Sequence, residues 1–279
     1  MRPSNADAVV RELVATASIE IIPMKGSDLA FDLVPAGSTL TVTCSSKFGL
    51  ERTLAYTEAA RLAGFTAVPH IAARQVSGRS ELAELLRRLA EAGVDNVYVI
   101  GGDADTPRGE YASAAELLAD LAGLDHGLRE IGVACYPEGH PAIPDDVLFD
   151  DLCRKQPLAT YMVSQMCFDV DAIVRWLGGV RARGIALPLR LGVAAPISVR
   201  RLAELSVRIG VGSSLRYLSK QHSMVRNLVL GGAYRPEQLL GRIATDPAYP
   251  DLGIGGVHLF SFNQVAATVD WQQRIAAAA

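Results

Sequence analysis

Carboxylate and imidazole side chains stand at the ends of short apolar segments in this sequence, and these groups could transfer protons. Glu20 interrupts one apolar run, His70 lies in another, and Asp103 directly follows the glycine pair Gly101 and Gly102. A carboxylate inside an apolar strand is costly unless it is paired or functional. Two carboxylates on separate segments, with an imidazole near them, would suit general acid–base chemistry.

Further polar side chains also lie at the ends of apolar segments. They are Thr41, Thr43, Cys44, Tyr136, Glu138, His140, Gln165, His258, Ser261 and Asn263. If the apolar segments are parallel strands of one barrel, their carboxyl ends meet and these side chains converge. The sequence therefore predicts one polar site that is built from several strand ends.

Each residue of the opening set also has a purely structural explanation. Glu20 could pair with an arginine at the opposite end of the fold, and His70 could be a core histidine bonded to a backbone carbonyl. Gly101 and Gly102 could serve only a tight turn, and Asp103 could cap that turn. These alternatives stay open at the level of the sequence.

Eight short β-rich segments alternate with longer amphipathic patterns along the chain. The strand candidates span residues 18–23, 39–44, 66–72, 96–102, 131–138, 160–166, 188–195 and 256–263. Helical patterns cover residues 6–15, 80–93, 113–127, 169–184, 198–210 and 215–242. Several strand candidates are continuously apolar, which is typical of parallel strands covered on both faces.

This order of elements predicts an α/β fold, a (β/α)8 TIM barrel preceded by an additional N-terminal helix. A doubly wound open sheet is the main alternative, but it usually places a glycine fingerprint in its first turn. The first turn here, from Ile22 to Asp28, lacks that fingerprint. No linker or shift of composition divides the chain, so residues 1–279 are expected to form a single catalytic domain.

Composition limits the partners and the compartment that we expect. The formal net charge is −3 with acidic and basic residues mixed, which predicts neither a nucleic-acid nor a membrane partner. The N-terminal segment lacks the pattern of a signal peptide. The four cysteines form no Cys-x-x-Cys pair, so we expect a cytoplasmic protein with reduced thiols. The oligomeric state stays open, and a homo-oligomer is one of the states allowed.

Several site classes fit the sequence poorly. His70, His140 and His258 lack the short spacings of a zinc site, so no metal site is predicted. A serine hydrolase is not indicated, because no Gly-x-Ser-x-Gly elbow occurs. Glu20 and Asp103 could flank a glycosidic bond. A glycosidase groove usually holds exposed aromatics, however, and only 6% of the residues are aromatic.

The strand-end motifs occur together in an order and spacing that resemble the methylenetetrahydrofolate reductase family. The motifs are IEIIP, TVTC, AVPHIA, GGDADTP, CYPEGHP, VSQMCFD, GIALPLRLGVAAP and GVHLFSFN, and they extend over residues 18–263. Each motif alone is weak, whereas YPEGHP followed by SQMCFD and GIALPLRLGV is specific. The resemblance implies a barrel of the short type and reduction of 5,10-methylenetetrahydrofolate to 5-methyltetrahydrofolate. In that family NAD(P)H reduces a bound FAD, which passes hydride to the folate.

The resemblance also implies roles for individual residues. Glu20 matches a general acid that opens the imidazolidine ring of the folate to an iminium, and such a group must hold a proton near neutral pH. Asp103 matches the carboxylate between flavin and folate, which would bind both. Gln165 matches a folate-contacting glutamine, and Tyr217 would replace a phenylalanine that stacks on the pterin or nicotinamide. The positions that match flavin contacts are Thr43, His70, Gly102, Ala112, Ser113, Tyr136, His140 and Lys155.

Three departures from the family pattern bear on the cofactor. The aromatic pair that usually follows the acid is Ile21 and Ile22 here, and the arginine that usually follows Asn263 is Gln264. The arginine that usually precedes Gly-Asp is Gly101, which removes a bidentate cation from a phosphate site. Because His70, Tyr136, His140 and Lys155 remain at matched positions, the resemblance still implies FAD, with NADH or NADPH as reductant. The sequence leaves open a flavin-independent reductase, the reverse oxidation, and a folate-binding or methyl-transfer barrel.

Overall fold

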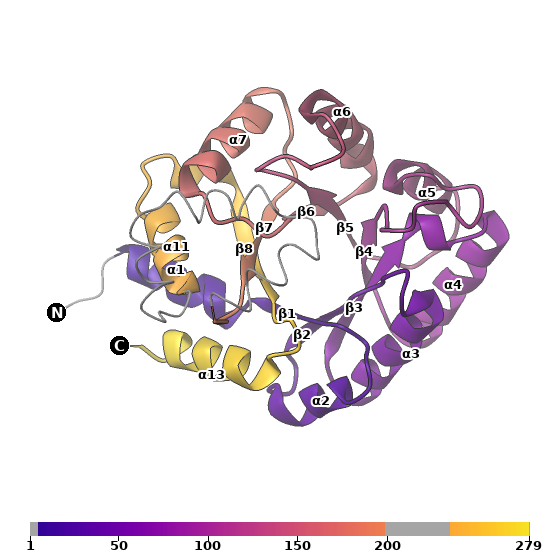
Figure 1. Cartoon of the computed structure of the whole chain (residues 1–279), viewed down its shortest axis with the longest axis horizontal. Coiled ribbons are helices and arrows are strands. Elements are labelled where there is room, and N and C mark those ends of the chain that lie inside the picture. Colours follow the sequence, from indigo (N-terminus) through magenta and orange to yellow (C-terminus); the bar gives the residue numbers. More distant parts are fainter. Residues whose placement is uncertain (1–4, 199–234, 279) are drawn as a thin grey trace.

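The structure is a computed structural model that describes residues 5–198 and 235–278. Within these ranges, parallel strands close into one barrel, in which each strand pairs with the next and β8 pairs with β1 (Figure 1). The strands are β1 (Ser18–Ile21), β2 (Thr39–Val42), β3 (Thr66–Ala72), β4 (Asn96–Ile100), β5 (Glu130–Cys135), β6 (Tyr161–Ser164), β7 (Leu189–Ala194) and β8 (Ile254–Phe260). The predicted (β/α)8 barrel is confirmed.

Helices separate the strands in sequence and surround the barrel (Figure 1). The α-helices are α1 (Asn5–Ala15), α2 (Ala30–Leu33), α3 (Gly49–Leu62), α4 (Arg79–Glu91), α5 (Ala114–Leu121), α6 (Asp145–Lys155), α7 (Val170–Ala182), α11 (Pro236–Ala244), α12 (Tyr249–Leu252) and α13 (Val265–Ala276). Short 3-10 turns are η1 (Ser27–Leu29), η2 (Ala73–Gln75) and η3 (Gln156–Leu158). The predicted N-terminal helix is α1, which packs against α11 and α13.

Helix α3 shows why apolar periodicity in the sequence fails to predict some helices. Its buried positions include Thr53 and Thr57 as well as Leu50, Leu54 and Ala60, so its inner face is not uniformly apolar. The cost of burying a threonine hydroxyl is offset inside the helix, because Thr57 Oγ1 donates a hydrogen bond to the carbonyl of Thr53 at 2.7 Å. A satisfied polar side chain can therefore stand in a core position and conceal the helical pattern.

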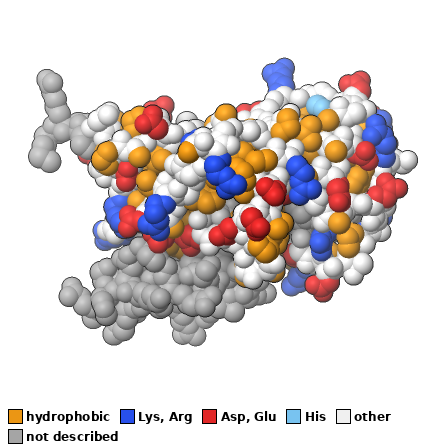
Figure 2. All heavy atoms as spheres, turned by 90° about the horizontal axis from the view of Figure 1, so that it is seen from above, with side chains coloured by type: hydrophobic (Ala, Val, Ile, Leu, Met, Phe, Trp, Pro, Cys, Tyr) orange, Lys and Arg blue, Asp and Glu red, His pale blue; other side chains and the backbone are white. Residues whose placement is uncertain are grey.

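Two of the expected helices fall mostly outside the residues that the structure describes. The helix expected over residues 198–210 and most of the one expected over 215–242 lie outside the described residues, and α11 corresponds to the end of the second. Among the described helices, none combines the length and the apolar character needed to cross a bilayer. On the face shown in Figure 2, basic and acidic side chains are interspersed among apolar ones.

The interior of the barrel is filled by side chains that alternate along the strands. At mid-height Val68, Tyr98, Tyr161 and Val163 form one buried apolar cluster. Gly132 makes room for this cluster, because a Cβ at that position would overlap the Tyr161 ring. The middle of the barrel is therefore a packed core, and the Tyr161 side chain extends from it to polar side chains at the amino ends of the strands.

Polar side chains at the amino ends of β4 to β7 form a closed network, which we call the floor (Asn96, Glu130, Tyr161 and Arg190). The hydroxyl of Tyr161 donates to Asn96 Oδ1 at 2.9 Å, and the amide of Asn96 donates to Glu130 Oε2. Arg190 donates to the same carboxylate oxygen at 2.9 Å, and its guanidinium lies 3.6 Å from the centroid of the Tyr161 ring. Every side chain of the floor thus has a polar partner.

Candidate active site

The carboxyl ends of the strands carry the polar site predicted from the sequence, which we call the mouth (Glu20, His70, Asp103, Gln165 and His258). At its centre, Glu20 Oε2 lies 3.0 Å from His258 Nε2 and 3.7 Å from His70 Nε2. Both histidines are buried, and the Glu20 side chain is 12% exposed. Among the described residues the partners of Glu20 are imidazoles, rather than the arginine of the structural alternative.

His258 holds Glu20 in place, a role that the sequence patterns do not assign to it. It pairs in register with Ser18, whose Oγ lies 3.3 Å from His258 Nδ1. Phe260 meets the imidazole edge-on with ring centroids 4.8 Å apart, and a Cβ at Gly192 would collide with the Phe260 ring. Strand alternation is the signal that could have found this residue, because His258 and Phe260 share the inner face with Ser18 and Glu20.

His70 contributes an uncharged imidazole to the same centre. Burial lowers the pKa of His70 to about 4, although the nearby Glu20 carboxylate acts in the opposite direction. The His70 ring meets Tyr98 edge-on, with centroids 4.7 Å apart. Burial also holds the pKa of Tyr98 well above its usual range. At neutral pH the rings of His70 and Tyr98, which line the centre of the mouth from the barrel interior, are therefore uncharged.

In and just after β2 and β3, several buried polar atoms have no hydrogen-bond partner among the described residues. Thr41 Oγ1, Thr43 Oγ1, His70 Nε2 and Gln75 Nε2 are buried and form no hydrogen bond within the described part of the chain. Leaving such an atom unsatisfied costs roughly 1–3 kcal/mol. Their concentration around one end of a barrel indicates where a polar ligand would complete the hydrogen bonding.

Asp103 lies at the end of β4, as the sequence predicts. Gly102 before it has a φ of +94°, and a Cβ there would approach the Cβ of Ala72 to 3.1 Å, so this turn requires glycine. Gly101 has open space around its Cβ position. Asp103 is exposed, and its Oδ1 accepts a hydrogen bond from the backbone N–H of Ser46 at 2.9 Å. It braces the loop after β2 and also offers a carboxylate at the mouth.

The loop after β5 is fixed against the start of α7. Glu138 Oε1 accepts hydrogen bonds from the backbone N–H groups of Phe168 at 2.8 Å and Asp169 at 3.0 Å. The rings of Tyr136 and His140 meet edge-on with centroids 5.3 Å apart. Burial raises the pKa of Tyr136 to about 12 and lowers the pKa of His140. This pair is therefore a neutral aromatic surface beside the mouth.

Two predicted substrate residues have different outcomes. Gln165 follows β6, and its Oε1 accepts a hydrogen bond from the backbone N–H of Met166 at 2.8 Å. This leaves the amide N–H groups of Gln165 as the donors that it can offer to a ligand. Tyr217, predicted to stack on a pterin or nicotinamide, lies outside the described residues.

Lys155 is a buried cation with two protein partners. The Lys155 side chain is 4% exposed, and its Nζ lies 2.7 Å from Asp151 Oδ2. The same Nζ donates a hydrogen bond to the carbonyl of Ala134 in β5 at 3.0 Å. The structure therefore places Lys155 behind the wall of the barrel, where its charge is already paired.

The predicted positions in the loop after β4 take part in capping and backbone contacts. Ser113 is the N-cap of α5, and its Oγ accepts a hydrogen bond from the Glu116 N–H at 3.3 Å. The carbonyl of Ala112 accepts from Arg74 Nε at 3.0 Å, and Arg74 Nη1 donates to the carbonyl of Ala104 at 2.9 Å. Arg74 thus fixes the loop that follows Asp103.

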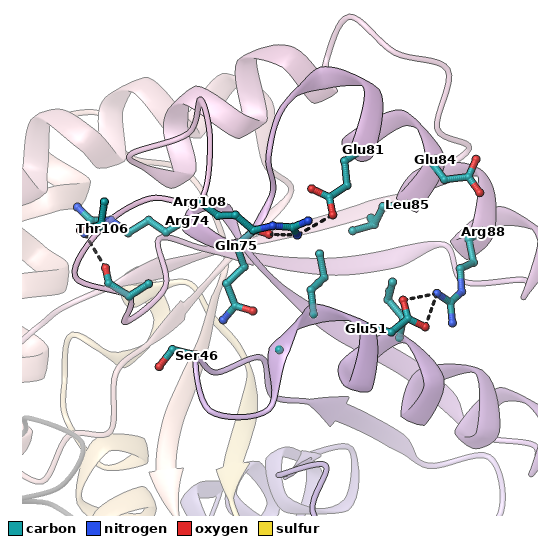
Figure 3. Close-up of a pocket in the computed structure, with 14 residues that line it drawn as sticks. Ser46, Glu51, Arg74, Gln75, Glu81, Glu84, Leu85, Arg88, Thr106 and Arg108 are labelled. Carbon is teal, nitrogen blue, oxygen red and sulfur yellow. Dashed lines mark hydrogen bonds and ion pairs between the residues drawn. The ribbon is translucent and has the colours of Figure 1, made fainter.

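A cleft of about 670 Å³ opens beside the mouth, between α3, α4 and the loops after β2, β3 and β4 (Figure 3). Charged groups on its walls are paired, Arg88 with Glu51 at 2.7 Å and Arg108 with Glu81 at 2.8 Å (Figure 3). Gln75 also lines the cleft, and it carries the unpartnered Nε2. Because both arginines are paired with carboxylates, they are not free to meet an anion.

The described residues at the matched positions fit a flat polar ring better than they fit a diphosphate. Thr43 and His70 offer unpartnered atoms, as hydrogen bonds to a flavin, pterin or nicotinamide would require. Gly101, which replaces the arginine of the family's phosphate site, has no side chain, and Lys155 at a matched flavin position is bonded to other protein groups. The ring end of FAD therefore fits these residues, whereas Gly101 supplies no cation for its diphosphate, and FAD binding stays a prediction.

Comparison with known proteins gives an independent line of argument. A model of the family described as methylenetetrahydrofolate reductase matches residues 30–214. Methylenetetrahydrofolate reductase 2 of Saccharomyces cerevisiae is 27% identical over 166 residues, which make up 53% of this chain and 28% of that protein. Methylenetetrahydrofolate reductase 1 of Schizosaccharomyces pombe is 35% identical over 118 residues, 39% of this chain and 19% of that protein. The chain thus spans less than a third of the length of these relatives.

Among solved structures, an aminoacrylate-bound tryptophan synthase from M. tuberculosis has a TM-score of 0.51 at 14% identity, with 99% of this chain and 100% of that chain covered. That likeness concerns the barrel fold alone. The family match includes His70, Asp103 and Gln165 but neither Glu20 nor His258, so the geometry of the Glu20 cluster is separate support. Because the matched range is more than half of the 279 residues, this chain belongs to the methylenetetrahydrofolate reductase family.

Proposed function

We propose that this protein reduces 5,10-methylenetetrahydrofolate to 5-methyltetrahydrofolate with NAD(P)H as the reductant. The observation that carries the proposal is the position of Glu20 at the mouth of a barrel of this family, held by His258 at 3.0 Å. A carboxyl group that is 12% exposed and in contact with an imidazole can hold a proton and replace it after transfer. A cytoplasmic location belongs to the same proposal, and the four unpaired cysteines support it.

In the proposed reaction, Glu20 acts as the general acid. Its proton goes to N10 of the folate as the bond between N10 and the methylene carbon breaks, which leaves an iminium at N5. A hydride, which originates from NAD(P)H, then adds to the methylene carbon and forms the methyl group, and NAD(P)+ is the other product. His258 orients the Glu20 carboxyl and can return a proton to it, because Ser18 fixes the other ring nitrogen.

Asp103 and Gln165 are proposed to hold the pterin from two sides of the mouth. The Asp103 carboxylate can accept hydrogen bonds from the amino edge of a pterin, and the Gln165 amide can donate to its carbonyl or ring nitrogens. Their positions at the ends of β4 and β6 support this role, because ligands of such barrels bind across several strand ends. Thr43 and His70 add the unpartnered atoms that a bound ring would satisfy.

The route of the hydride divides the proposal into two forms. FAD, predicted from the family resemblance, would accept hydride from NAD(P)H and deliver it to the folate. Direct transfer from NAD(P)H is the second form, and it is favoured by Gly101 and by the pairing of Lys155 with Asp151. An absorption spectrum of the purified protein, followed by anaerobic titration with NADH, separates them. Flavin bands that bleach on titration support the first form, and a colourless active enzyme supports the second.

The function itself is tested by the stoichiometry of turnover. NADH and NADPH oxidation should depend on added methylenetetrahydrofolate, and one 5-methyltetrahydrofolate should form for each nicotinamide oxidised. Folate binding without nicotinamide oxidation would support a catalytically inactive folate-binding barrel instead. Methyl transfer from 5-methyltetrahydrofolate to an added acceptor, without any nicotinamide change, would support a methyl-transfer barrel. Running the assay from 5-methyltetrahydrofolate and NAD(P)+ measures the reverse oxidation.

A further inference from the structure

Three side chains at the centre of the mouth have the atom types of a metal-binding site. The carboxylate of Glu20 and one ring nitrogen each of His70 and His258 lie within 4.8 Å of one another. They come from β1, β3 and β8, so the closure of the barrel brings them together although they are far apart in the chain. The proposed hydride transfer uses Glu20 as an acid and assigns no metal to this set.

The distances suit a small divalent ion. Zinc binds histidine nitrogen and carboxylate oxygen at about 2.0–2.2 Å, so two ligand atoms of a tetrahedral ion lie about 3.3 Å apart. The separations of 3.0 Å from Glu20 Oε2 to His258 Nε2 and 3.7 Å to His70 Nε2 lie on either side of that value. Small adjustments of the side chains would therefore place all three atoms on one ion.

The surroundings of the three ligands resemble the support that metal sites need. His258 Nδ1 faces Ser18 Oγ at 3.3 Å, an arrangement that leaves Nε2 as the ligand atom when Nδ1 donates. Tyr98 packs edge-on against His70, and Phe260 packs edge-on against His258, which fixes both rings. His70 Nε2 is buried and has no hydrogen-bond partner among the described residues. A metal ion would satisfy this nitrogen.

We propose that Glu20, His70 and His258 form a three-ligand site for a divalent transition-metal ion such as Zn²⁺, and that metal binding and folate reduction at the mouth exclude each other. The second part rests on the proposed function. A Glu20 oxygen that is bonded to a metal has no proton to give to the folate, and the ion would occupy the space next to that oxygen. Two imidazoles and one carboxylate favour Zn²⁺, Co²⁺ or Ni²⁺ over Mg²⁺ and Ca²⁺, which select oxygen ligands.

Binding can be tested without any measurement of activity, because Co²⁺ reports its coordination by visible absorption. Protein treated with a chelator and then titrated with Co²⁺ should show the intense d–d bands of a four- or five-coordinate ion, saturating at one ion per chain. Zn²⁺ should remove the bands by displacement. Mg²⁺ in excess should leave them unchanged. Absence of the bands, or bands equally sensitive to Mg²⁺, would overturn the proposal.

Variants locate the site. His70→Ala and Glu20→Gln each remove one ligand, and each should weaken Co²⁺ binding by about a hundredfold or more, since loss of an outer-shell partner alone costs 10- to 100-fold. His126→Ala is the matched control, because His126 is outside the mouth and accepts a hydrogen bond from the Leu128 N–H. Circular dichroism confirms folding, and Glu20→Gln keeps the side-chain shape if His70→Ala does not fold. Equal binding by the wild type and both ligand variants would place the metal elsewhere and overturn the proposal.

The effect of Zn²⁺ on folate turnover tests the metal proposal separately from the proposed function. Zn²⁺ should raise the apparent KM for methylenetetrahydrofolate in the wild type, and a chelator should restore it. If Co²⁺ binds as expected but Zn²⁺ leaves turnover unchanged, the claim of mutual exclusion fails while the metal site stands. If no folate turnover is found under any condition, the proposed function fails, and the cobalt spectra still decide whether the site binds metal.

Discussion

The polar side chains at the two ends of the barrel differ in how completely their hydrogen-bonding atoms are satisfied. At the floor, the hydroxyl of Tyr161, the amide of Asn96 and the guanidinium of Arg190 all meet partners within one network. Around the mouth, four buried polar atoms form no hydrogen bond within the described residues, namely Thr41 Oγ1, Thr43 Oγ1, His70 Nε2 and Gln75 Nε2. The two ends also differ in burial, because the Glu130 side chain at the floor is 48% exposed whereas His70 and His258 at the mouth are buried.

The difference separates stability from function in physical terms. A satisfied hydrogen-bond network adds stability, whereas each unsatisfied buried atom costs roughly 1–3 kcal/mol. The chain tolerates that cost at the mouth, where a ligand would remove it. Substitutions at the floor should therefore change the free energy of unfolding, and substitutions at the mouth should change ligand binding or turnover.

The largest effect is expected for Glu20→Gln. Glutamine has the same shape and can still contact His258, but it cannot donate an acidic proton to the folate. We expect kcat for folate reduction to fall by about 10²- to 10⁴-fold, the usual contribution of a general acid. The free energy of unfolding should change by less than about 1 kcal/mol. Steady-state assays with methylenetetrahydrofolate and urea unfolding measure the two quantities.

The control for this variant is a change of carboxylate on the outer surface. Glu91→Gln on α4 removes an exposed partner of Arg87 and should leave turnover unaltered. If the protein holds a flavin, Glu20→Gln should also retain electron transfer from NADH to menadione, because that reaction needs no folate acid. Full folate activity in Glu20→Gln would contradict the role of the mouth as an acid–base site.

At the floor, Tyr161→Phe should produce the reverse outcome. It removes the hydroxyl that donates to Asn96 Oδ1, and leaves that buried oxygen without its partner. The expected loss is about 1–3 kcal/mol in the free energy of unfolding, with kcat and KM unchanged. Urea denaturation followed by circular dichroism gives the first quantity. A loss of activity without a loss of stability would show that the floor is not the structural end of the barrel.

The sequence predicts the barrel because each strand is an apolar segment and each turn follows a recognisable break. The helix pattern that begins at residue 113 corresponds to α5, which starts with a capping box in which Ser113 and Glu116 make both hydrogen bonds. Helix α3 is harder to predict, because it buries Thr53 and Thr57 on the face that periodicity would require to be apolar. Satisfied polar groups in core positions thus limit what apolar patterns can show.

The site is predicted less completely, and for a different reason. Strand ends indicate that Glu20, Asp103 and Gln165 share one end of the barrel, but not which side chains make contact. The contact between Glu20 and His258 joins residues 238 positions apart, and it depends on the register between β1 and β8. The engagement of Lys155 by Ala134 and Asp151 likewise depends on how α6 packs, which residue types alone do not determine.

A smaller effect, with opposite signs at two threonines, would sharpen the contrast. Thr43→Val replaces a buried hydroxyl that has no partner, so the free protein should gain about 1 kcal/mol in the free energy of unfolding. Thr53→Val is the matched control, because Thr53 Oγ1 donates to the carbonyl of Thr43 at 2.9 Å, and its loss should cost about 1 kcal/mol. Denaturant unfolding of both variants tests the signs. Destabilisation by Thr43→Val would mean that its hydroxyl is satisfied in the free protein.

The smallest effect concerns how tightly the strands and helices around the mouth are packed. The reactivity of the cysteine thiols measures this packing. Burial raises the pKa of the Cys135 thiol to about 12, so at pH 8 almost none of it is the reactive thiolate. Cys153 on α6 is exposed, whereas Cys44 and Cys167 are buried. One thiol should therefore react rapidly with Ellman's reagent at pH 8, with turnover unchanged, and all four should react after denaturation. A second fast thiol would reveal that the wall opens around the mouth, and protection of that thiol by methylenetetrahydrofolate would identify the opening as the one the ligand closes.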